Sequence, residues 1–150
     1  MTNALEIRNV TKTYKNGVQA VKGVDLCIKQ GDFFALLGHN GAGKSSMVAQ
    51  LSTVTSGSID ILGVDIQKKP AFTRSQIGVM PQEVNLNMFE TCWNNMRAQA
   101  AYYGLSYRKT KAYLETLLKQ ADLWDARHRQ ARSFSGGMKR RLMIARALVH

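Results

Sequence analysis

The sequence predicts an α/β fold with a β-rich start, an α/β unit and a helical block at the end. Apolar and polar residues alternate near the N-terminus, as in half-buried strands. A continuous apolar run at 33–37 then leads through glycines into a stretch with helical character, and apolar residues recur at helical spacing beyond residue 90. With 150 residues, 45% of them hydrophobic, the chain is long enough for about one domain.

The N-terminal strands are predicted by their period of two. Leu5 and Ile7 alternate with polar neighbours, and so do the apolar residues of 24–28. Between them, residues 15–17 read Lys-Asn-Gly, which favours a tight hairpin turn because Asn and Gly tolerate a positive φ. The run at 33–37 is apolar without alternation, which is typical of a strand covered on both faces in a parallel sheet.

The remaining elements are predicted from apolar spacing and capping residues. Gly104 is a suitable C-terminal cap for the helix before it, and Ser106 can cap the helix after it. That second helix has an apolar stripe at i, i+3, i+4 and i+7, formed by Leu114, Leu117, Leu118 and Ala121. We expect helices at 44–51, at 90–103, after Ser106, and from Gly136 to at least Leu148, and short strands at 58–62 and 77–80.

The chain is strongly basic. Its 21 Lys and Arg against 10 Asp and Glu give a net charge of +11, which predicts attraction to polyanions without choosing among nucleic acid, anionic lipid and nucleotide phosphates. No acidic residue follows Asp125. The simplest interpretation of the basic residues at 127–146 is a solvated helix face. The alternative is a surface that approaches anionic lipid or acidic loops of a partner.

The cysteines and the N-terminus indicate the compartment. Cys27 and Cys92 are far apart and form neither a CxxC pair nor a disulfide framework, which indicates a reducing cytosol. The N-terminus has no basic patch followed by an apolar core, so we expect no signal peptide. The longest apolar run, 33–37, is far shorter than the ~20 residues that span a bilayer. We therefore expect a soluble or peripheral protein.

A phosphate-binding loop is predicted directly after the apolar run. The segment fits the pattern G-x-x-x-x-G-K-[S/T], in which glycines let backbone N–H groups point at phosphates and the following helix adds its dipole. Lys44 would reach the β- and γ-phosphates, Ser45 would ligate Mg²⁺, and Ser46 would donate to the α-phosphate. The candidate nucleotide-binding residues of this loop are Gly38, His39, Asn40, Gly41, Ala42, Gly43, Lys44, Ser45 and Ser46.

A second glycine element opens the last predicted helix. Ser135 can act as the N-cap of this helix, while Gly136 and Gly137 allow close approach of a phosphate. Taken alone, Ser-Gly-Gly is also typical of a plain turn before a helix. Its occurrence together with the phosphate loop makes it a candidate nucleotide-binding element.

Together these motifs resemble the nucleotide-binding subunit of ATP-binding-cassette (ABC) transporters. The resemblance extends over essentially the whole chain. The Met-Lys-Arg-Arg that follows Gly137 is similar to the branch that exports drugs, antibiotics or glycans through a separate permease. The segments that carry the resemblance are 5–14, the phosphate loop, 56–59, 80–83 and 135–148.

The resemblance implies roles for three further elements. Tyr14 matches the aromatic residue on which adenine stacks; the alternative is a tyrosine held between strands. Gln82 matches the glutamine that contacts Mg²⁺ and the attacking water and senses the permease; the alternative is an exposed loop amide. Residues 135–137 match the signature, which in this family binds the γ-phosphate of ATP held by the opposite subunit. Lys44 and Gln82 are thus the candidate catalytic residues, and Ser45 and Gln82 are the candidate Mg²⁺ ligands.

The fold that the resemblance implies is a P-loop NTPase core with an N-terminal antiparallel β subdomain and an α-helical subdomain. We expect the β subdomain and phosphate-loop core at 1–82, and the helical subdomain with the signature helix at 83–150. In the family, a buried strand ending in Asp-Glu, the Walker B strand, follows the signature helix and supplies metal binding and the catalytic base. We expect a chain truncated before this strand, as in the N-terminal portion of a longer subunit, which alone is inactive in hydrolysis.

The leading hypothesis is the motor subunit of a membrane exporter, an ABC-type ATPase that uses ATP and Mg²⁺. Its expected partners are a second nucleotide-binding subunit and an integral-membrane permease, at the cytoplasmic face of the cell membrane, with no nucleic acid. Two alternatives stay open. One is a truncated cassette that binds ATP without hydrolysing it, and the other is a soluble ABC protein of translation or DNA repair whose basic charge gives nucleic-acid affinity.

Overall fold

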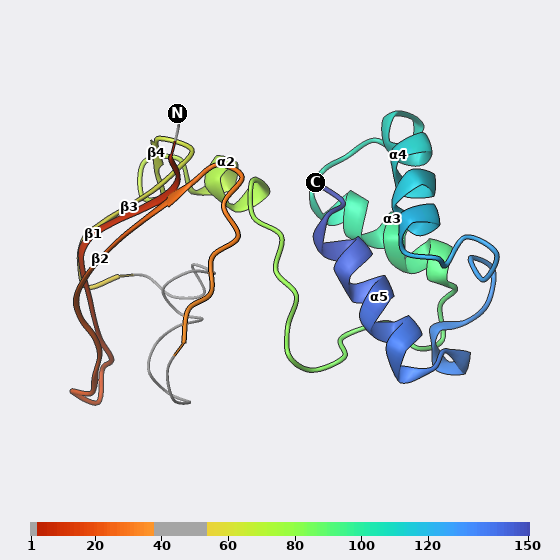
Figure 1. The fold of residues 1–150 in the computed structure, drawn as a ribbon, viewed down its shortest axis with the longest axis horizontal. Coiled ribbons are helices and arrows are strands. Elements are labelled where there is room, and N and C mark those ends of the chain that lie inside the picture. Colours follow the sequence, from red (N-terminus) through yellow and green to blue (C-terminus); the bar gives the residue numbers. More distant parts are fainter. Residues whose placement is uncertain (1–2, 38–53) are drawn as a thin grey trace. The chain divides into compact units, whose positions relative to one another are not determined.

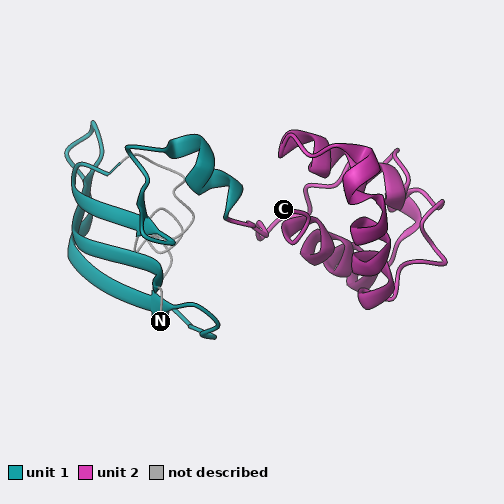
Figure 2. Ribbon diagram, turned by 90° about the horizontal axis from the view of Figure 1, so that it is seen from above, with its two compact units in different colours: residues 1–76 teal, residues 77–150 magenta. Residues whose placement is uncertain are grey.

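The computed structural model describes residues 3–37 and 54–150, and the chain divides into two compact units, Met1–Gln76 and Ile77–His150 (Figure 2). The described part of the first unit is a sheet with one short helix, and the second unit is helical. The phosphate loop and the helix expected at 44–51 lie outside the described residues.

Four strands form the sheet of the first unit within the described residues, in the order β2-β1-β3-β4 (Figure 1). β1 (Asn3–Thr13) and β2 (Gln19–Lys29) pair as a long hairpin, and β3 (Ser56–Ile61) pairs with the other edge of β1. β4 (Val64–Asp65) completes the sheet and precedes helix α2 (Pro70–Ser75). All three strand pairs are antiparallel, which confirms the β-rich start that alternation predicts and the antiparallel subdomain that the resemblance implies.

The burial of the strands follows their alternation. Leu5 and Ile7 are both buried, while Arg8 beside them is exposed. Ile7 is opposite Leu26 of β2 and Ile59 of β3, so one apolar row runs across three strands. This row belongs to the buried part of the first unit, together with Leu5, Val10, Val21 and Ile61, and explains why the sequence pattern identifies these strands.

Two predicted strands are wrong. Residues 33–37 are irregular, and the side chains of Phe33 and Leu37 are 102% and 91% exposed. Residues 77–80 are also irregular. A strand needs a neighbouring strand to pair its N–H and C=O groups, and none of the described strands lies beside either segment. The apolar run alone therefore misled the prediction, because pairing partners are not visible in it.

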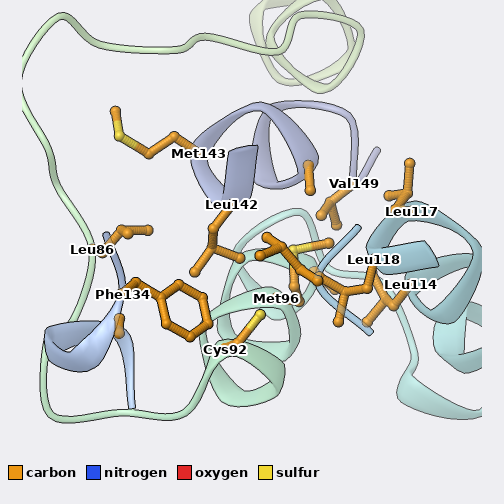
Figure 3. Packing of buried hydrophobic residues seen from close by; sticks show 14 residues of the cluster. Leu86, Cys92, Met96, Leu114, Leu117, Leu118, Phe134, Leu142, Met143 and Val149 are labelled. Atoms are coloured by element: carbon orange, nitrogen blue, oxygen red, sulfur yellow. The ribbon is translucent and has the colours of Figure 1, made fainter. Parts of the chain in front are cut away.

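Three helices pack around the core of the second unit: α3 (Cys92–Tyr102), α4 (Tyr107–Gln120) and α5 (Gly136–Ala147). A short 3-10 helix, Ala131–Ser133, precedes α5. Figure 3 shows side chains of the three helices converging on a shared interior. The buried hydrophobic cluster consists of Leu86, Cys92, Met96, Ala100, Leu114, Leu117, Leu118, Leu123, Ala131, Phe134, Leu142, Met143, Ala145 and Val149.

The three predicted helices of the second unit are found, with ends that differ by up to two residues from the prediction. α3 begins at Cys92 because Thr91 is its N-cap, and the Thr91 Oγ1 accepts a hydrogen bond from the Asn94 N–H at 3.1 Å. α5 ends at Ala147, with Leu148 as the C-cap rather than a helical residue. The predicted apolar stripe of α4 does face the core, at Leu114, Leu117, Leu118 and, partly buried, Ala121.

Candidate functional site

Five of the predicted site residues lie in the described part of the chain: Tyr14, Gln82, Ser135, Gly136 and Gly137. Tyr14 belongs to the first unit, whereas Gln82 and the signature residues belong to the second. The second unit therefore brings Gln82 and the signature into one compact body. The nine predicted residues of the phosphate loop, Gly38 through Ser46, including Lys44 and Ser45, lie outside the described residues.

The N-terminus of α5 keeps backbone donors available for a ligand. Ser135 is the N-cap, and its Oγ accepts a hydrogen bond from the Met138 N–H at 3.2 Å. The Lys139 N–H donates to the Ser135 carbonyl at 3.0 Å. The N–H groups of Gly136 and Gly137 make no hydrogen bond to another described residue, as expected for the first turn of a helix. Two donors thus remain at the positive end of the helix dipole.

The space in front of these two donors is open. Gly136 and Gly137 are exposed, and a Cβ built on Gly136 would meet no atom within 4 Å. The nearest atom to a Cβ on Gly137 is the Ser135 Oγ, at 4.0 Å. The first turn of α5 contains no acidic residue that would repel an anion. This end of α5 can therefore accept a phosphate at close range.

Gln82 lies in an irregular segment that α5 holds by its main chain. The Gln82 carbonyl accepts a hydrogen bond from Arg140 Nη1 at 3.2 Å. Asn85, three residues after Gln82, is held in the same way. Its carbonyl and its Oδ1 accept hydrogen bonds from Arg146 Nη1, at 2.8 Å and 3.2 Å. The Gln82 side chain is exposed and makes no hydrogen bond to another described residue. The main chain is thus fixed while the amide stays available.

The start of the same segment is held by α3 and by the end of α5. The Tyr103 hydroxyl donates to the Ile77 carbonyl at 3.0 Å. The Tyr103 ring also stacks on His150, with the ring centroids 5.1 Å apart. Gly78 lies so close to α5 that an added Cβ would overlap the Ala147 carbonyl. The segment is therefore attached at several points although it has no regular secondary structure.

Arg146 is a residue whose importance sequence reasoning missed. It was predicted on a solvated basic face, but it is half-buried, and its Nη2 donates to the Gln99 Oε1 at 2.8 Å. Burial lowers the pKa of the Arg146 guanidinium below its ordinary value, because loss of water disfavours the charged form. One sequence signal could have found it: Arg146 is the only polar residue in the otherwise apolar stretch 142–149.

Other basic residues at 127–146 also make specific contacts instead of forming one continuous face. The Arg127 guanidinium lies 4.2 Å from the ring centroid of Trp124. Arg141 Nη1 is 2.8 Å from the Asp122 carboxylate. Arg129, Arg132 and Arg140 are exposed, as a solvated face predicts, whereas Arg146 is not. Several of its cations serve contacts within the second unit.

Tyr14 lies at the turn between β1 and β2. Its N–H donates to the Val18 carbonyl and its carbonyl accepts from the Gly17 N–H, both at 2.9 Å. Gly17 has φ +82, which confirms the turn predicted from Lys-Asn-Gly. The Tyr14 side chain is 43% exposed, with Lys12 Nζ 5.4 Å from the ring centroid. The ring borders an open hollow of about 690 Å³ that residues 54–55 also line.

The described residues offer Mg²⁺ no acidic cluster. Within 3–37 and 54–150, no three His, Cys, Asp or Glu side chains are grouped so that they could hold a metal ion. Gln82, the one predicted Mg²⁺ ligand that the structure describes, presents a neutral oxygen at the surface. Mg²⁺ keeps water and phosphate oxygens among its ligands, so one protein oxygen at the site fits this ion.

None of the helices described in 3–37 and 54–150 is both long enough and apolar enough to cross a lipid bilayer.

Two curated relatives are similar to this chain over nearly all of its length. The Nod factor export ATP-binding protein I of Rhizobium meliloti is 36% identical over 152 residues, which cover 99% of this chain and 45% of the relative. The linearmycin resistance ATP-binding protein LnrL of Bacillus subtilis is 36% identical, over 97% of this chain and 48% of the relative. The chain thus spans about half the length of the curated relatives it matches.

The fold is that of an ABC cassette with a P-loop NTPase core. The solved dimeric structure of MJ0796, a bacterial ABC transporter cassette, matches with a TM-score of 0.78 and 29% identity, over 97% of this chain and 69% of that chain. A sequence model described as ABC transporter matches residues 21–150. From this match and the relatives above, the chain belongs to the ABC transporter family.

Proposed function

We propose that this chain forms the ATP-binding part of the motor subunit of an ABC exporter. The observation that carries the proposal is the N-terminus of α5, where Ser135 caps the helix and two exposed glycines leave two N–H donors unused. Such a helix end suits a phosphate oxygen. In a family of ATP-binding proteins, the phosphate of ATP is the ligand that this geometry favours.

The nucleotide would be held mainly by the phosphate loop. Lys44 would contact the β- and γ-phosphates, Ser45 and Gln82 would hold Mg²⁺, and Tyr14 would stack on the adenine ring. Mg²⁺ supplies neutralisation of the charge on the β- and γ-phosphate oxygens. The exposed amide of Gln82 and the 43% exposure of Tyr14 support these assignments, because a ligand can reach an exposed side chain.

The signature would act on ATP bound to a second subunit. The N–H groups of Gly136 and Gly137 would donate to the γ-phosphate. The Ser135 hydroxyl would donate as well, because its oxygen accepts from Met138 and its own proton stays available. Two identical chains related by a twofold axis would then bind two nucleotides. The dimeric state of the MJ0796 cassette supports this arrangement.

A separate membrane permease is the second proposed partner, and the cytoplasmic face of the membrane is the proposed location. Support comes from the two relatives, one named as an ATP-binding protein of an export system and the other of a resistance system. Neither relative is named for translation or DNA repair, so the soluble alternative gains no support from them.

Residues 1–150 on their own are proposed to bind ATP and to be inactive in its hydrolysis. Phosphoryl transfer depends on the placement of charges and of the attacking water. No Asp-Glu pair, which the family resemblance places after the signature helix, occurs within residues 1–150. The division of roles between a phosphate-loop part, 1–82, and a signature part, 83–150, belongs to the same proposal.

The proposal is tested by measuring the affinity of the chain for a fluorescent ATP analogue. Lys44→Ala is expected to weaken binding about 10- to 100-fold, because charge-assisted contacts to the phosphates are lost. Lys68→Ala is the matched control, since Lys68 is an exposed lysine of the same unit and should leave binding unchanged. Unchanged affinity in Lys44→Ala would remove the phosphate loop from the proposal.

The signature role has its own test. Gly136→Ala adds a methyl group where the protein has no atom within 4 Å, so the fold should tolerate it. The same methyl group stands where the phosphate would approach. We expect normal stability and a weaker ATP-dependent dimer, measured by analytical ultracentrifugation. An ATP-dependent dimer of unchanged affinity would show that the phosphate binds elsewhere.

A further inference from the structure

We infer that Arg140 and Arg146 are positioning residues: from the side of α5 they hold the main chain that carries Gln82 in a fixed place relative to the signature at the start of the same helix. The effect that this positioning would have on ATP hydrolysis rests on the proposed function. The geometry that carries the inference lies within the second unit alone.

The two arginines match the segment in spacing. Arg140 and Arg146 are six residues apart on α5, which corresponds to about 9 Å along the helix axis. Their acceptors, Gln82 and Asn85, are three residues apart, a span of up to about 10 Å in an extended chain. The segment bends at Gln82 and Glu83, so its ends lie closer together than in an extended chain, and one arginine contacts each end.

Apolar packing does not fix the residues between these two contacts. Residues 82–85 are all exposed, and the first side chain buried in the core after them is Leu86. A cavity of about 60 Å³, lined by Pro81, Gln99 and Arg146 among others, lies between the segment and the helices. The hydrogen bonds from the arginines are thus the contacts that define where 82–85 lies.

The surroundings of Arg146 favour a role in geometry over a role in stability. Its Nη1 and Nη2 donate to neutral oxygens of Asn85 and Gln99, and none of the described carboxylates forms an ion pair with it. Its Nε is buried without a hydrogen-bond partner among the described residues. A partly buried cation without a counter-ion and with an unused donor is unfavourable compared with an apolar side chain. What the guanidinium provides is a rigid fork that donates to three acceptor atoms, two on Asn85 and one on Gln99.

The helix connects both halves of the candidate site. α5 begins at Gly136, carries the signature at that end, and carries Arg140 and Arg146 further along. Because a helix of this length moves as one body, a displacement of the signature also displaces the carbonyls of Gln82 and Asn85. Gln82 would then reach the attacking water only when the signature end of α5 is in the right position.

A distance measurement tests the inference without nucleotide. Nitroxide labels on Glu83→Cys and Thr116→Cys report the separation of the segment from α4 by pulsed electron paramagnetic resonance, in a Cys27→Ser background of the full chain. Burial raises the pKa of the remaining Cys92 to about 12, so this thiol stays protonated and unlabelled. We expect a narrow distance distribution in the reference protein and a broader one in Arg146→Met.

Two further variants keep the measurement decisive. Arg140→Ala removes an exposed side chain and should also broaden the distribution, which covers the case of Arg146→Met failing to fold. Arg141→Ala is the matched control, because Arg141 lies on the same helix but pairs with Asp122 and should leave the distribution unchanged. Arg146→Lys should restore part of the narrow distribution, since one ammonium group can still reach the Asn85 carbonyl.

Turnover of ATP by the full-length subunit gives the second readout. Arg146→Met is expected to lower kcat about tenfold while KM for ATP changes less than about twofold, because the contact acts on Gln82 and not on the phosphate loop. Arg141→Ala should leave both constants unchanged. A loss of kcat of the same size in Arg141→Ala would mean that any change on α5 has this effect and would overturn the inference.

The outcomes separate this inference from the proposed function. A distance distribution that stays narrow in both Arg146→Met and Arg140→Ala overturns the positioning role, whatever the chain does with ATP. Unchanged ATP binding in Lys44→Ala overturns the proposed function, while the distances still decide how the segment is held.

Discussion

The two units hold their candidate residues by different kinds of contact. In the first, Tyr14 is placed by backbone hydrogen bonds to Val18 and Gly17, a few residues away in a hairpin turn. In the second, Gln82 is placed by an arginine 58 residues later in the sequence, and Asn85 by one that is 61 residues later. The first arrangement forms wherever the local sequence forms a hairpin, while the second exists only when α5 is packed against the rest of its unit.

The difference between the units can be followed experimentally because both tryptophans lie in the second. Trp93 and Trp124 are the only two tryptophans of the chain, and their rings meet edge to face with centroids 5.9 Å apart. Tryptophan fluorescence therefore reports the unfolding of the second unit. Hydrogen exchange of the β1 amides reports the opening of the first.

The largest effect is expected from Leu142→Ala, in the core side of α5. Leu142 is 0% exposed, so its removal should lower the free energy of unfolding of the second unit by about 2–5 kcal/mol. Denaturation followed by tryptophan fluorescence measures this loss. Ile144→Ala, on the exposed side of the same helix, is the control and should cost far less. An equal loss of protection in the β1 amides would show that the two units unfold as one.

Gly57→Ala should produce the next largest loss of stability, and this loss should occur in the first unit. Gly57 has φ +87, and an added Cβ would lie 2.5 Å from the Asn9 carbonyl oxygen. Strain and overlap together should cost about 2–3 kcal/mol, seen as faster exchange in β1 and β3. Gly63→Ala is the matched control, because Gly63 has φ +76 but open space around it, and should cost about 1 kcal/mol. Equal costs for the two variants would contradict the close approach of Gly57 to β1.

A smaller effect is expected from Ser135→Ala, which removes the cap of α5. The loss of the hydrogen bond from the Met138 N–H should lower the stability of the second unit by about 1 kcal/mol. Ser106→Ala offers a matched control, since Ser106 is the N-cap residue of α4 but its side chain makes no capping hydrogen bond. If both variants lose the same stability, the side-chain contact of Ser135 has no role in holding the helix end.

The smallest effect is the response to acid, which both units should show. Hydrogen bonds from Asn3 and Arg8 hold the pKa of Glu6 below its ordinary value, and Lys119 does the same for the pKa of Glu115. Each carboxylate therefore stabilises its unit above its ordinary pKa, and this contribution disappears as the pH falls through the lowered pKa. We expect a slight loss of stability below about pH 4, absent for the first unit in Glu6→Gln and for the second in Glu115→Gln. Stability that rises on acidification would contradict both pairs.

Periodicity and capping made much of the fold predictable. The alternation at Leu5 and Ile7 identifies β1 because its sheet is buried on one face, and Ser135 identifies the start of α5 because a cap acts within one turn. The run at 33–37 misled the prediction for the opposite reason. Whether an apolar run becomes a strand depends on neighbours that are distant in the sequence, and no described strand lies beside it.

In the candidate site, too, local features could be predicted from the sequence and long-range contacts could not. The motif around Lys44, the signature and the hairpin turn at Tyr14 are local patterns, and each was identified from consecutive residues. The contacts of Arg146 could not be predicted in the same way. A guanidinium finds acceptors only after helices from different parts of the chain have packed, and the same residue on a solvated helix would have none of these contacts.

The sequence by itself determined the family of this protein, its short-range elements and the residue types of its nucleotide site, because all of these depend on backbone preferences and side chains within a few positions of one another. Only the tertiary structure decided that 77–80 is irregular, that Arg146 is half-buried, and that Gln82 is attached to the signature helix. These features depend on which groups meet after the chain has folded, and on the cost of removing a charge from water at that place.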